Sequence, residues 1–405
     1  MLFELTNKER KYVGLEPVET TWKKVLVTSP AKEEEKWLYF DGETIRKLIT
    51  ISSCRYREDQ VEQQTADDGQ TLLPKTAKGK SKKLTFSSLE SLSGIGVYFE
   101  YAAWGVKIAN YSTQTTFYGA KCAGDSFSVD GLRTWLDTWI AGTNQGDLAE
   151  LASFRIAKRQ HVKIHEGDFF AFKVGRREWG FGRILLDIPS LRKTDEFKKS
   201  KNYGLQNLMG PTLIVKVYHI IRNTPEIDID ELHSCSAFPS QPIMDNCFYY
   251  GEYKIIGHKP LQIDEQDMLI SCRRSVWAGE MDIVYLQYGL IFRMEKSKLI
   301  HSRLEQLGVA EEERARILKE CKYMKETNSF GLEILSDLDL MKKCVGERSN
   351  VRYWDSDLTN AGEDLRNPKL YELKKVIFTA FGLDADKNYA ENLAFPAETN
   401  VYFPN

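Results

Sequence analysis

The 405-residue chain is long enough for two or three domains, and 42% hydrophobic with 28% charged residues is a balance that excludes a disordered polypeptide. Its formal net charge of −2 argues against a surface that attracts nucleic acid or anionic lipid. The start, MLFELTNKERKYVG, lacks the apolar core of a secretory signal, and no apolar run approaches the roughly 20 residues that span a bilayer. The seven cysteines are odd in number and scattered along the chain, which is typical of reduced thiols rather than of disulfides, so we expect a cytoplasmic protein. We also expect that it does not contact membranes.

The first predicted region, 1–125, is rich in β-strands. Short β-branched and aromatic runs predict strands at 24–29, 36–40 and 46–53, and two or three more strands within 96–118. Residues 57–83 are polar and rich in turn formers, which predicts a long mobile loop. That loop includes the basic stretch from Lys75 to Lys83, which we interpret as solvated.

A helical connector is predicted over 126–160. Apolar side chains at helical spacing form a complete stripe, and Gly142 is the expected stop. The stripe consists of Leu132, Trp135, Leu136, Trp139 and Ile140. A second helix is expected over 147–160, with a basic end that suits the helix dipole.

The region 161–295 returns to β-structure, with a charged loop at 190–210. The expected strands are 161–165, 168–174, 179–186, 212–221, 248–257 and 283–293. We expect a strongly bent antiparallel sheet or an SH3-like barrel, in which Phe170, Phe172, Ile184, Val215 and Val217 are buried.

The stretch GDFFAFKVGRREWGFGRILL (167–186) reads as a hairpin. Trp179, Phe181 and Arg183 share one face of its second strand. Gly180 and Gly182 leave a bare strip on the other face, against which a bulky group can lie closely.

The tail, 296–405, changes to helical periodicity. We expect one helix to end at Gly308, a second over about 310–323, and a third over 367–382 that begins at Asn367. The predicted fold class is therefore α+β, with a helical C-terminal region.

Motifs that carry catalytic chemistry are missing from the sequence. It has no nucleophile elbow, phosphate-binding loop or zinc-ligand spacing, so we expect neither a catalytic residue nor a cofactor. His161 and His165 could share a strand face and form part of a metal site, which is a weak alternative to a structural role.

Three stretches in order, EGDFFAFKV, WGFGRILLD and GEYKIIGHKPL, resemble the immunity protein 26 family. Sequences of that family run Gly-Asp-x-Phe-Ala, then Gly-Phe-Gly-Arg, then Gly-x-Trp-x-Ile-Ile-Gly-His. Tyr253 stands where the family often has Trp. The resemblance is strongest over about 165–295.

The resemblance implies a bacterial immunity protein that binds and neutralises a cognate toxin of a polymorphic toxin system, without catalysis. Some family members carry the label phosphotriesterase, so a metal-dependent hydrolase is one alternative, and a nucleic-acid-binding module is another. Anchors at protein interfaces are commonly aromatic or Arg side chains. The partner-binding candidates are Trp179, Phe181, Arg183, Tyr250, Tyr253 and His258.

Overall fold

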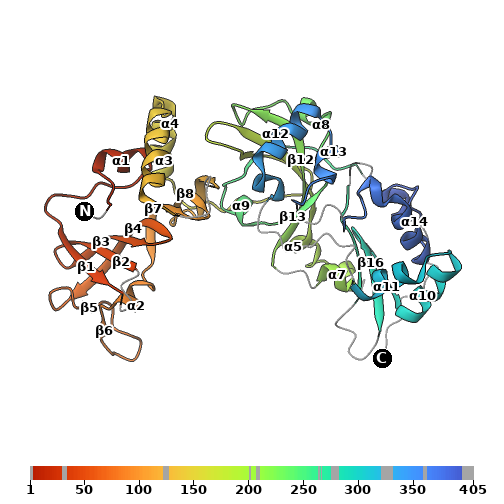
Figure 1. The fold of residues 1–405 in the computed structure, drawn as a ribbon, viewed down its shortest axis with the longest axis horizontal. Helices are drawn as coiled ribbons and strands as arrows, with labels where there is room; N and C mark the ends of the chain where they lie inside the picture. Colours follow the sequence, from red (N-terminus) through yellow and green to blue (C-terminus); the bar gives the residue numbers. More distant parts are fainter. Residues whose placement is uncertain are drawn as a thin grey trace. The chain divides into compact units, whose positions relative to one another are not determined.

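The fold is that of a computed structural model, whose helices and strands are labelled in Figure 1. The residues that it describes are 3–29, 34–121, 127–199, 202–206, 210–262, 265, 267–274, 282–320, 332–358 and 363–394.

The chain divides into two compact units. Unit 1 consists of Met1–Val162 and Tyr250–Glu252, and unit 2 consists of Lys163–Tyr249 and Tyr253–Asn405. The four-part division expected from the sequence stays a prediction. No helix in the described part of either unit combines the length and apolar character needed to cross a membrane.

Unit 1 contains an antiparallel sheet with the strand order β1-β2-β3-β4-β7-β8-β9, and β5 and β6 extend it from β4. Its strands are β1 (Lys23–Thr28), β2 (Glu34–Asp41), β3 (Thr44–Ser52), β4 (Arg55–Ala66), β5 (Thr71–Leu72), β6 (Lys82–Lys83), β7 (Gly94–Ala102), β8 (Gly105–Asn110) and β9 (Thr115–Ala120). Its helices are α1 (Asn7–Tyr12), α2 (Phe86–Leu89), α3 (Val129–Ala141) and α4 (Gln145–Arg155).

The expectation of a loop over 57–83 is wrong for its first ten residues. They belong to β4, which pairs with both β3 and β7. Polar composition concealed this central strand, because its charged side chains are satisfied by partners within the sheet. Arg57, for example, donates through Nε to Asp59 at 2.9 Å and through Nη1 to Glu100 at 3.0 Å.

The predicted apolar stripe of α3 is confirmed, and it covers the sheet of unit 1. Leu132, Leu136 and Trp139 are buried in one cluster with side chains of β7 and β8. Ser128 caps the start of the helix, which ends before Gly142 as expected. The next helix, α4, ends at Arg155 rather than at 160, and Ile156 is left 75% exposed.

Unit 2 confirms the α+β class. One antiparallel sheet has the order β13-β12-β11-β10-β14, and a second, of three strands, has the order β15-β16-β17. The strands are β10 (Asp168–Lys173), β11 (Trp179–Asp187), β12 (Thr212–Arg222), β13 (Gln241–Met244), β14 (Lys254–His258), β15 (Ile270–Arg274), β16 (Ile283–Tyr288) and β17 (Ile291–Lys296). Among the described strands, β13 and β14 do not pair, so the sheet is open and the barrel alternative is wrong.

Several predicted boundaries in unit 2 are also wrong. Residues 161–165 form no strand, since both edges of β10 are already occupied by β11 and β14. The expected strand 248–257 is interrupted at Gly251, which has φ +76°, and the expected strand 283–293 is a hairpin that turns at Gly289. Short helices replace the loop expected over 190–210, namely α5 (Ile188–Leu191), α6 (Asp195–Lys199) and α7 (Tyr203–Gln206).

The glycine strip of β11 is filled by the phenylalanines of β10. Phe170 lies opposite Gly182, and Phe172 lies opposite Gly180. A Cβ atom at Gly182 would lie 2.3 Å from the Phe170 ring, and one at Gly180 would lie 2.6 Å from the Phe172 ring. The bulky neighbour expected from the sequence is therefore the adjacent strand. The predicted burial is confirmed for Phe170, Phe172, Ile184, Val215 and Val217.

The tail is helical, as expected, and packs into the cores of unit 2. Its helices are α10 (Ser297–Gln306), α11 (Glu311–Ala315), α12 (Leu338–Glu347), α13 (Val351–Trp354), α14 (Tyr371–Ala380) and α15 (Tyr389–Leu393). Gly308 follows α10 with φ +76°, and a turn that begins at Asn367 precedes α14. The helix expected to 323 is α-helical to Ala315 and π-helical from Arg316 to Glu320, and 321–323 lie outside the described residues.

Removal of residues 296–405 should make the remaining chain aggregate. Met341, Cys344 and Tyr353 of the tail are fully buried against the five-stranded sheet, and Ile377 and Phe378 are buried against the three-stranded one. Their loss would expose two apolar sheet faces to water. Size-exclusion chromatography of the truncated protein measures this effect, and a monodisperse, cooperatively melting truncation would contradict it.

Candidate partner-binding face

Three of the six partner-binding candidates lie together on one face of β11, below the protein surface. Trp179 is 6% exposed, and both Phe181 and Arg183 are 0% exposed. The face is covered in part by α8 (Ile229–His233), from which Leu232 joins the same buried cluster. The ammonium groups of Lys254 and Lys173 lie over the Trp179 ring, 4.5 Å and 5.0 Å from its centroid.

The other aromatic candidates lie elsewhere. Tyr253 packs into the opposite face of the sheet, stacked on Phe170 with the ring centroids 5.8 Å apart. Tyr250 belongs to unit 1, where the guanidinium of Arg159 lies 5.4 Å from its ring. The six residues therefore do not form one continuous surface, and their role in partner binding stays a prediction.

Arg183 holds a loop in place beneath the surface. Its Nη1 donates to Oε1 of Glu265 at 2.5 Å, and its Nη2 donates to the carbonyl oxygens of Lys259 at 2.8 Å and Pro260 at 3.2 Å. The guanidinium also lies 4.5 Å from the Phe169 ring centroid. These contacts hold the segment that follows β14 in place, so Arg183 is a positioning residue for the side chains of that segment.

Asp168 orients a histidine beside this loop. It opens β10, opposite His258 in the register with β14. The side chain of Asp168 is 6% exposed and accepts a hydrogen bond from Nδ1 of His258 at 2.8 Å, whereas the imidazole of His258 is 50% exposed. The second oxygen of Asp168 accepts the backbone N–H of His165 at 2.7 Å. A buried carboxylate thus fixes one imidazole and leaves its Nε2 at the surface.

A third histidine completes the group. Nδ1 of His233, at the end of α8, lies 3.0 Å from Oε1 of Glu265, which also binds Arg183. Burial is the largest influence on Glu265 and raises its pKa. The Gln262 backbone N–H and the charges of Arg183 and His233 outweigh burial, and they hold the pKa of Glu265 below its usual value. We call the surface formed by His165, Asp168, His233, His258, Lys259 and Glu265 the polar face.

A family model matches the part of the chain that builds this face. Residues 165–282 match immunity protein 26. The resemblance seen in the sequence is confirmed over this segment. Comparison with curated proteins and with solved structures gave no match.

The immunity protein 26 segment supplies every residue of the polar face. The matched segment begins at His165, the first residue of the polar face in the sequence, and it includes Glu265, the last. It also includes Trp179, Phe181, Arg183 and Tyr253, which support the sheet beneath. The three motifs that carry the resemblance supply Asp168, His258, Lys259 and the supporting Arg183, and the rest of the segment supplies His165, His233 and Glu265.

Histidines expected as weak metal ligands have other neighbours. His161 lies beside Tyr250 in unit 1, with the ring centroids 6.4 Å apart. His165, in the immunity protein 26 segment, faces Asp168 with Nδ1 3.6 Å from Oδ2. Within the described ranges, no three or more His, Cys, Asp or Glu side chains are arranged to hold a metal ion.

Sequence reasoning missed His233, Asp168 and Glu265. His233 and Glu265 come from segments far from β10 in the sequence, which the antiparallel pairing of β11 with β12 and of β10 with β11 and β14 brings together. Asp168 stood in the first recognised stretch, where a carboxylate directly before an apolar strand could have been identified as a candidate.

Proposed function

We propose that this protein is an immunity protein that binds a cognate bacterial toxin through the polar face, by stoichiometric protein–protein contact. The main support for the proposal is that every residue of the polar face belongs to the segment that matches immunity protein 26. The first two motifs form the β10–β11 hairpin, and the third, which lies far away in the sequence, pairs with it, so that His258, Asp168 and the loop that Arg183 binds lie side by side. A surface assembled in this way suits recognition, because its scaffold is buried and fixed before the partner arrives.

The chemistry of the polar face suits a charged protein partner. The side chains of His165 and His258 are 70% and 50% exposed, and Lys259 pairs with the exposed Asp230 at the rim. Half-buried Ile229 and Ile256 lie next to the polar groups. Mixed charges around a small apolar centre favour specificity and fast association, as at many protein interfaces.

We propose a supporting role for most of the candidates identified from the sequence, because their side chains are buried. In this proposal Trp179, Phe181 and Arg183 stabilise the strands and the loop beneath the polar face without contacting the toxin. Tyr253 does the same from the other side of the sheet. We propose His258 as the direct contact among the sequence candidates in unit 2. We propose a reducing cytoplasm as the place of action, which the free thiols of Cys54, Cys235 and Cys344 support.

Replacing both His165 and His258 by Ala should weaken toxin binding at least tenfold, because a few central contacts carry most of the binding energy of an interface and a loss of about 1.4 kcal/mol is tenfold in affinity. The partner used is the C-terminal domain of the toxin that we expect the neighbouring gene to encode. Titration calorimetry measures the affinity, and growth of cells that co-express the toxin measures protection. The matched control is His301→Ala on α10, outside the matched segment. A double variant that melts normally, binds equally and protects equally would refute this role of the polar face.

A further inference from the structure

Strand β1 is an open edge of the unit 1 sheet. It is the terminal strand, and among the described residues it pairs only with β2. The N–H of Ser29 donates to the carbonyl of Glu34 at 3.0 Å. In an antiparallel pair every second residue makes hydrogen bonds to the neighbouring strand, so alternate residues of β1, counted back from Ser29, face β2. Lys24, Leu26 and Thr28 therefore direct their backbone N–H and C=O groups away from β2. Leu26 also has a 42% exposed side chain.

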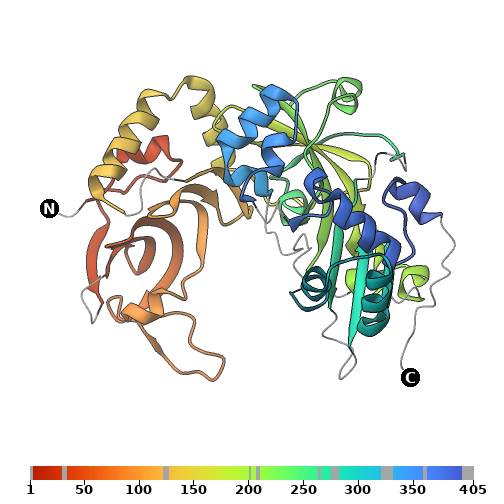
Figure 2. The same cartoon turned by 45° about the vertical axis from the view of Figure 1, so that its right-hand side comes forward.

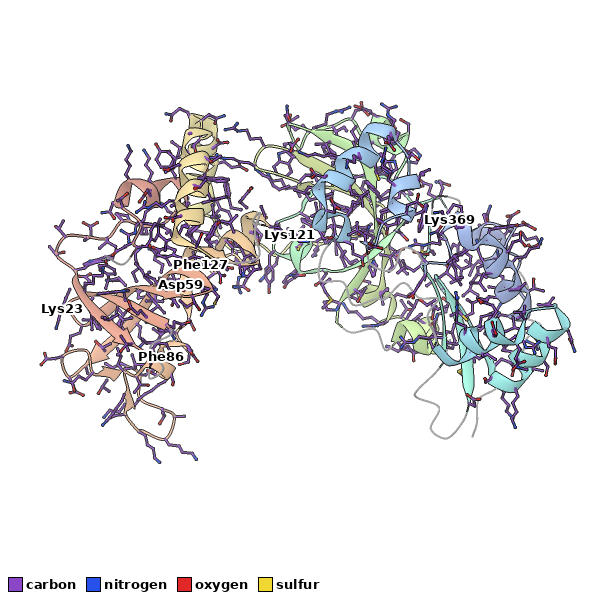
Figure 3. The ribbon with its side chains drawn as sticks, in the orientation of Figure 1. Lys23, Asp59, Phe86, Lys121, Phe127 and Lys369 are labelled. Carbon is purple, nitrogen blue, oxygen red and sulfur yellow. The ribbon has the colours of Figure 1, made fainter. Side chains whose placement is uncertain are left out.

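A groove of about 860 Å³ lies beside this edge. It is lined from the β1 side by Lys23 and Val25, and from the β5–β6 extension by Thr71, Lys83 and Leu84. The sheet curls from β1 to β4 (Figure 2), and both the terminal strand β1 and the end of the β5–β6 extension contribute walls to one groove. Lys23 marks the start of β1 in Figure 3.

The floor of the groove is apolar and fixed. Phe40 lies in it, and the turn at Gly69 closes over the Phe40 ring. Gly69 has φ +83°, and a Cβ atom there would lie 3.0 Å from that ring, so the tight turn requires glycine. Val25 and Leu84 pack on the same apolar cluster as Phe40.

We propose that the groove binds an extended segment of a partner protein, which pairs with β1 as an added strand. The free groups of Lys24, Leu26 and Thr28 supply the backbone hydrogen bonds, and alternate side chains of the segment enter the groove over Phe40. This site lies outside the immunity protein 26 segment and does not depend on the toxin-binding proposal.

The charged residues of the groove indicate the charge expected at one end of the partner segment. Glu43, Asp67 and Asp68 line the groove at the strand turns, and Lys23 and Lys83 line it too, so these five side chains carry a net charge of −1. No described residue forms an ion pair or side-chain hydrogen bond with the carboxylates of Glu43 or Asp68. A segment that alternates apolar residues and carries a Lys or Arg at the end nearest these turns complements the groove.

A proline substitution tests the pairing with little effect on the fold. Leu26→Pro removes an N–H that β2 does not use, and proline is tolerated at sheet edges. Leu26→Thr is the matched control, because it keeps the N–H and strand propensity. The probe is a library of random decapeptides displayed on phage and selected on the full-length protein, followed by affinity measurement with the enriched synthetic peptides.

We expect enriched peptides with alternating apolar residues and a basic end. They should bind the wild type and Leu26→Thr within a few-fold of each other, bind Leu26→Pro at least tenfold more weakly, and slow amide hydrogen exchange at Leu26. Equal binding to Leu26→Pro, or no enrichment, would overturn the proposal. A dimer of the protein that Leu26→Pro dissociates would also overturn it, because a second copy would then be the occupant.

Discussion

Replacing Glu58 by Gln is expected to lower the free energy of unfolding of unit 1 by about 3–5 kcal/mol. The Glu58 side chain on β4 is fully buried. It accepts hydrogen bonds from Arg10 Nε at 2.8 Å, Lys47 Nζ at 2.5 Å and Tyr56 Oη at 2.9 Å. The substitution leaves the buried ammonium of Lys47 without its carboxylate, and loosens the contact that ties α1 to the sheet.

The pH dependence of this effect has a definite sign. Burial is the largest influence on Glu58 and raises its pKa. The charges of Lys47 and Arg10 outweigh burial, so the pKa in the folded protein lies below its usual value. The stabilisation is therefore present above the unfolded pKa of about 4.3, and it is lost as the pH falls through the folded value.

Urea unfolding of the two proteins between pH 7 and pH 3 measures both effects. The difference between wild type and Glu58→Gln should shrink in the acidic range. Glu62→Gln is the matched control, because Glu62 lies on the same strand and pairs with Arg46 at the surface. That variant should lose less than about 1 kcal/mol. Equal losses for the two variants would contradict a structural role for the buried network.

The second large effect is expected for Arg183→Met, again about 3–5 kcal/mol, because it breaks a buried ion pair. Arg183 is fully buried, and its loss leaves the carbonyls of Lys259 and Pro260 without their donor. The Glu265 carboxylate, 13% exposed, loses its shortest partner. The loop after β14 should loosen as a result, and toxin binding should weaken with it.

Two measurements separate these consequences. Urea unfolding gives the loss of stability, and hydrogen exchange of 259–262 reports the loop. Arg222→Met on β12 is the control, because Arg222 pairs with Glu231 where both side chains are nearly half exposed. It should cost less than about 1 kcal/mol. If Arg183→Met changed neither stability nor exchange, Arg183 would not be a positioning residue.

Alternation along strands predicted the interior of unit 2 well. Phe170, Phe172 and Ile184 are buried where the period of two placed them, on the face opposite Trp179 and Phe181. The bare strip at Gly180 and Gly182 correctly predicted a close neighbour. Such local patterns depend on residues a few positions apart, so the sequence displays them directly.

Features that depend on distant partners were not predicted. The alternating apolar residues of 161–165 suggested a strand, but no free edge of β10 was left to pair with it. Strand β4 looked like a loop because Glu58 and Arg57 are charged, and their partners Lys47 and Glu100 lie on other strands. Arg183 was predicted as a partner-binding candidate without its ligands, Glu265 and the Lys259 carbonyl, because these cannot be inferred from spacing.

The toxin-binding proposal is tested most directly by hydrogen exchange of the full-length protein, alone and in complex with the toxin domain that we expect the neighbouring gene to encode. We predict a one-to-one complex in which 165–168, 233 and 256–262 become protected, with no toxin modified or consumed. A complex that leaves these residues unprotected, or the absence of a complex with that domain, would contradict binding through the polar face.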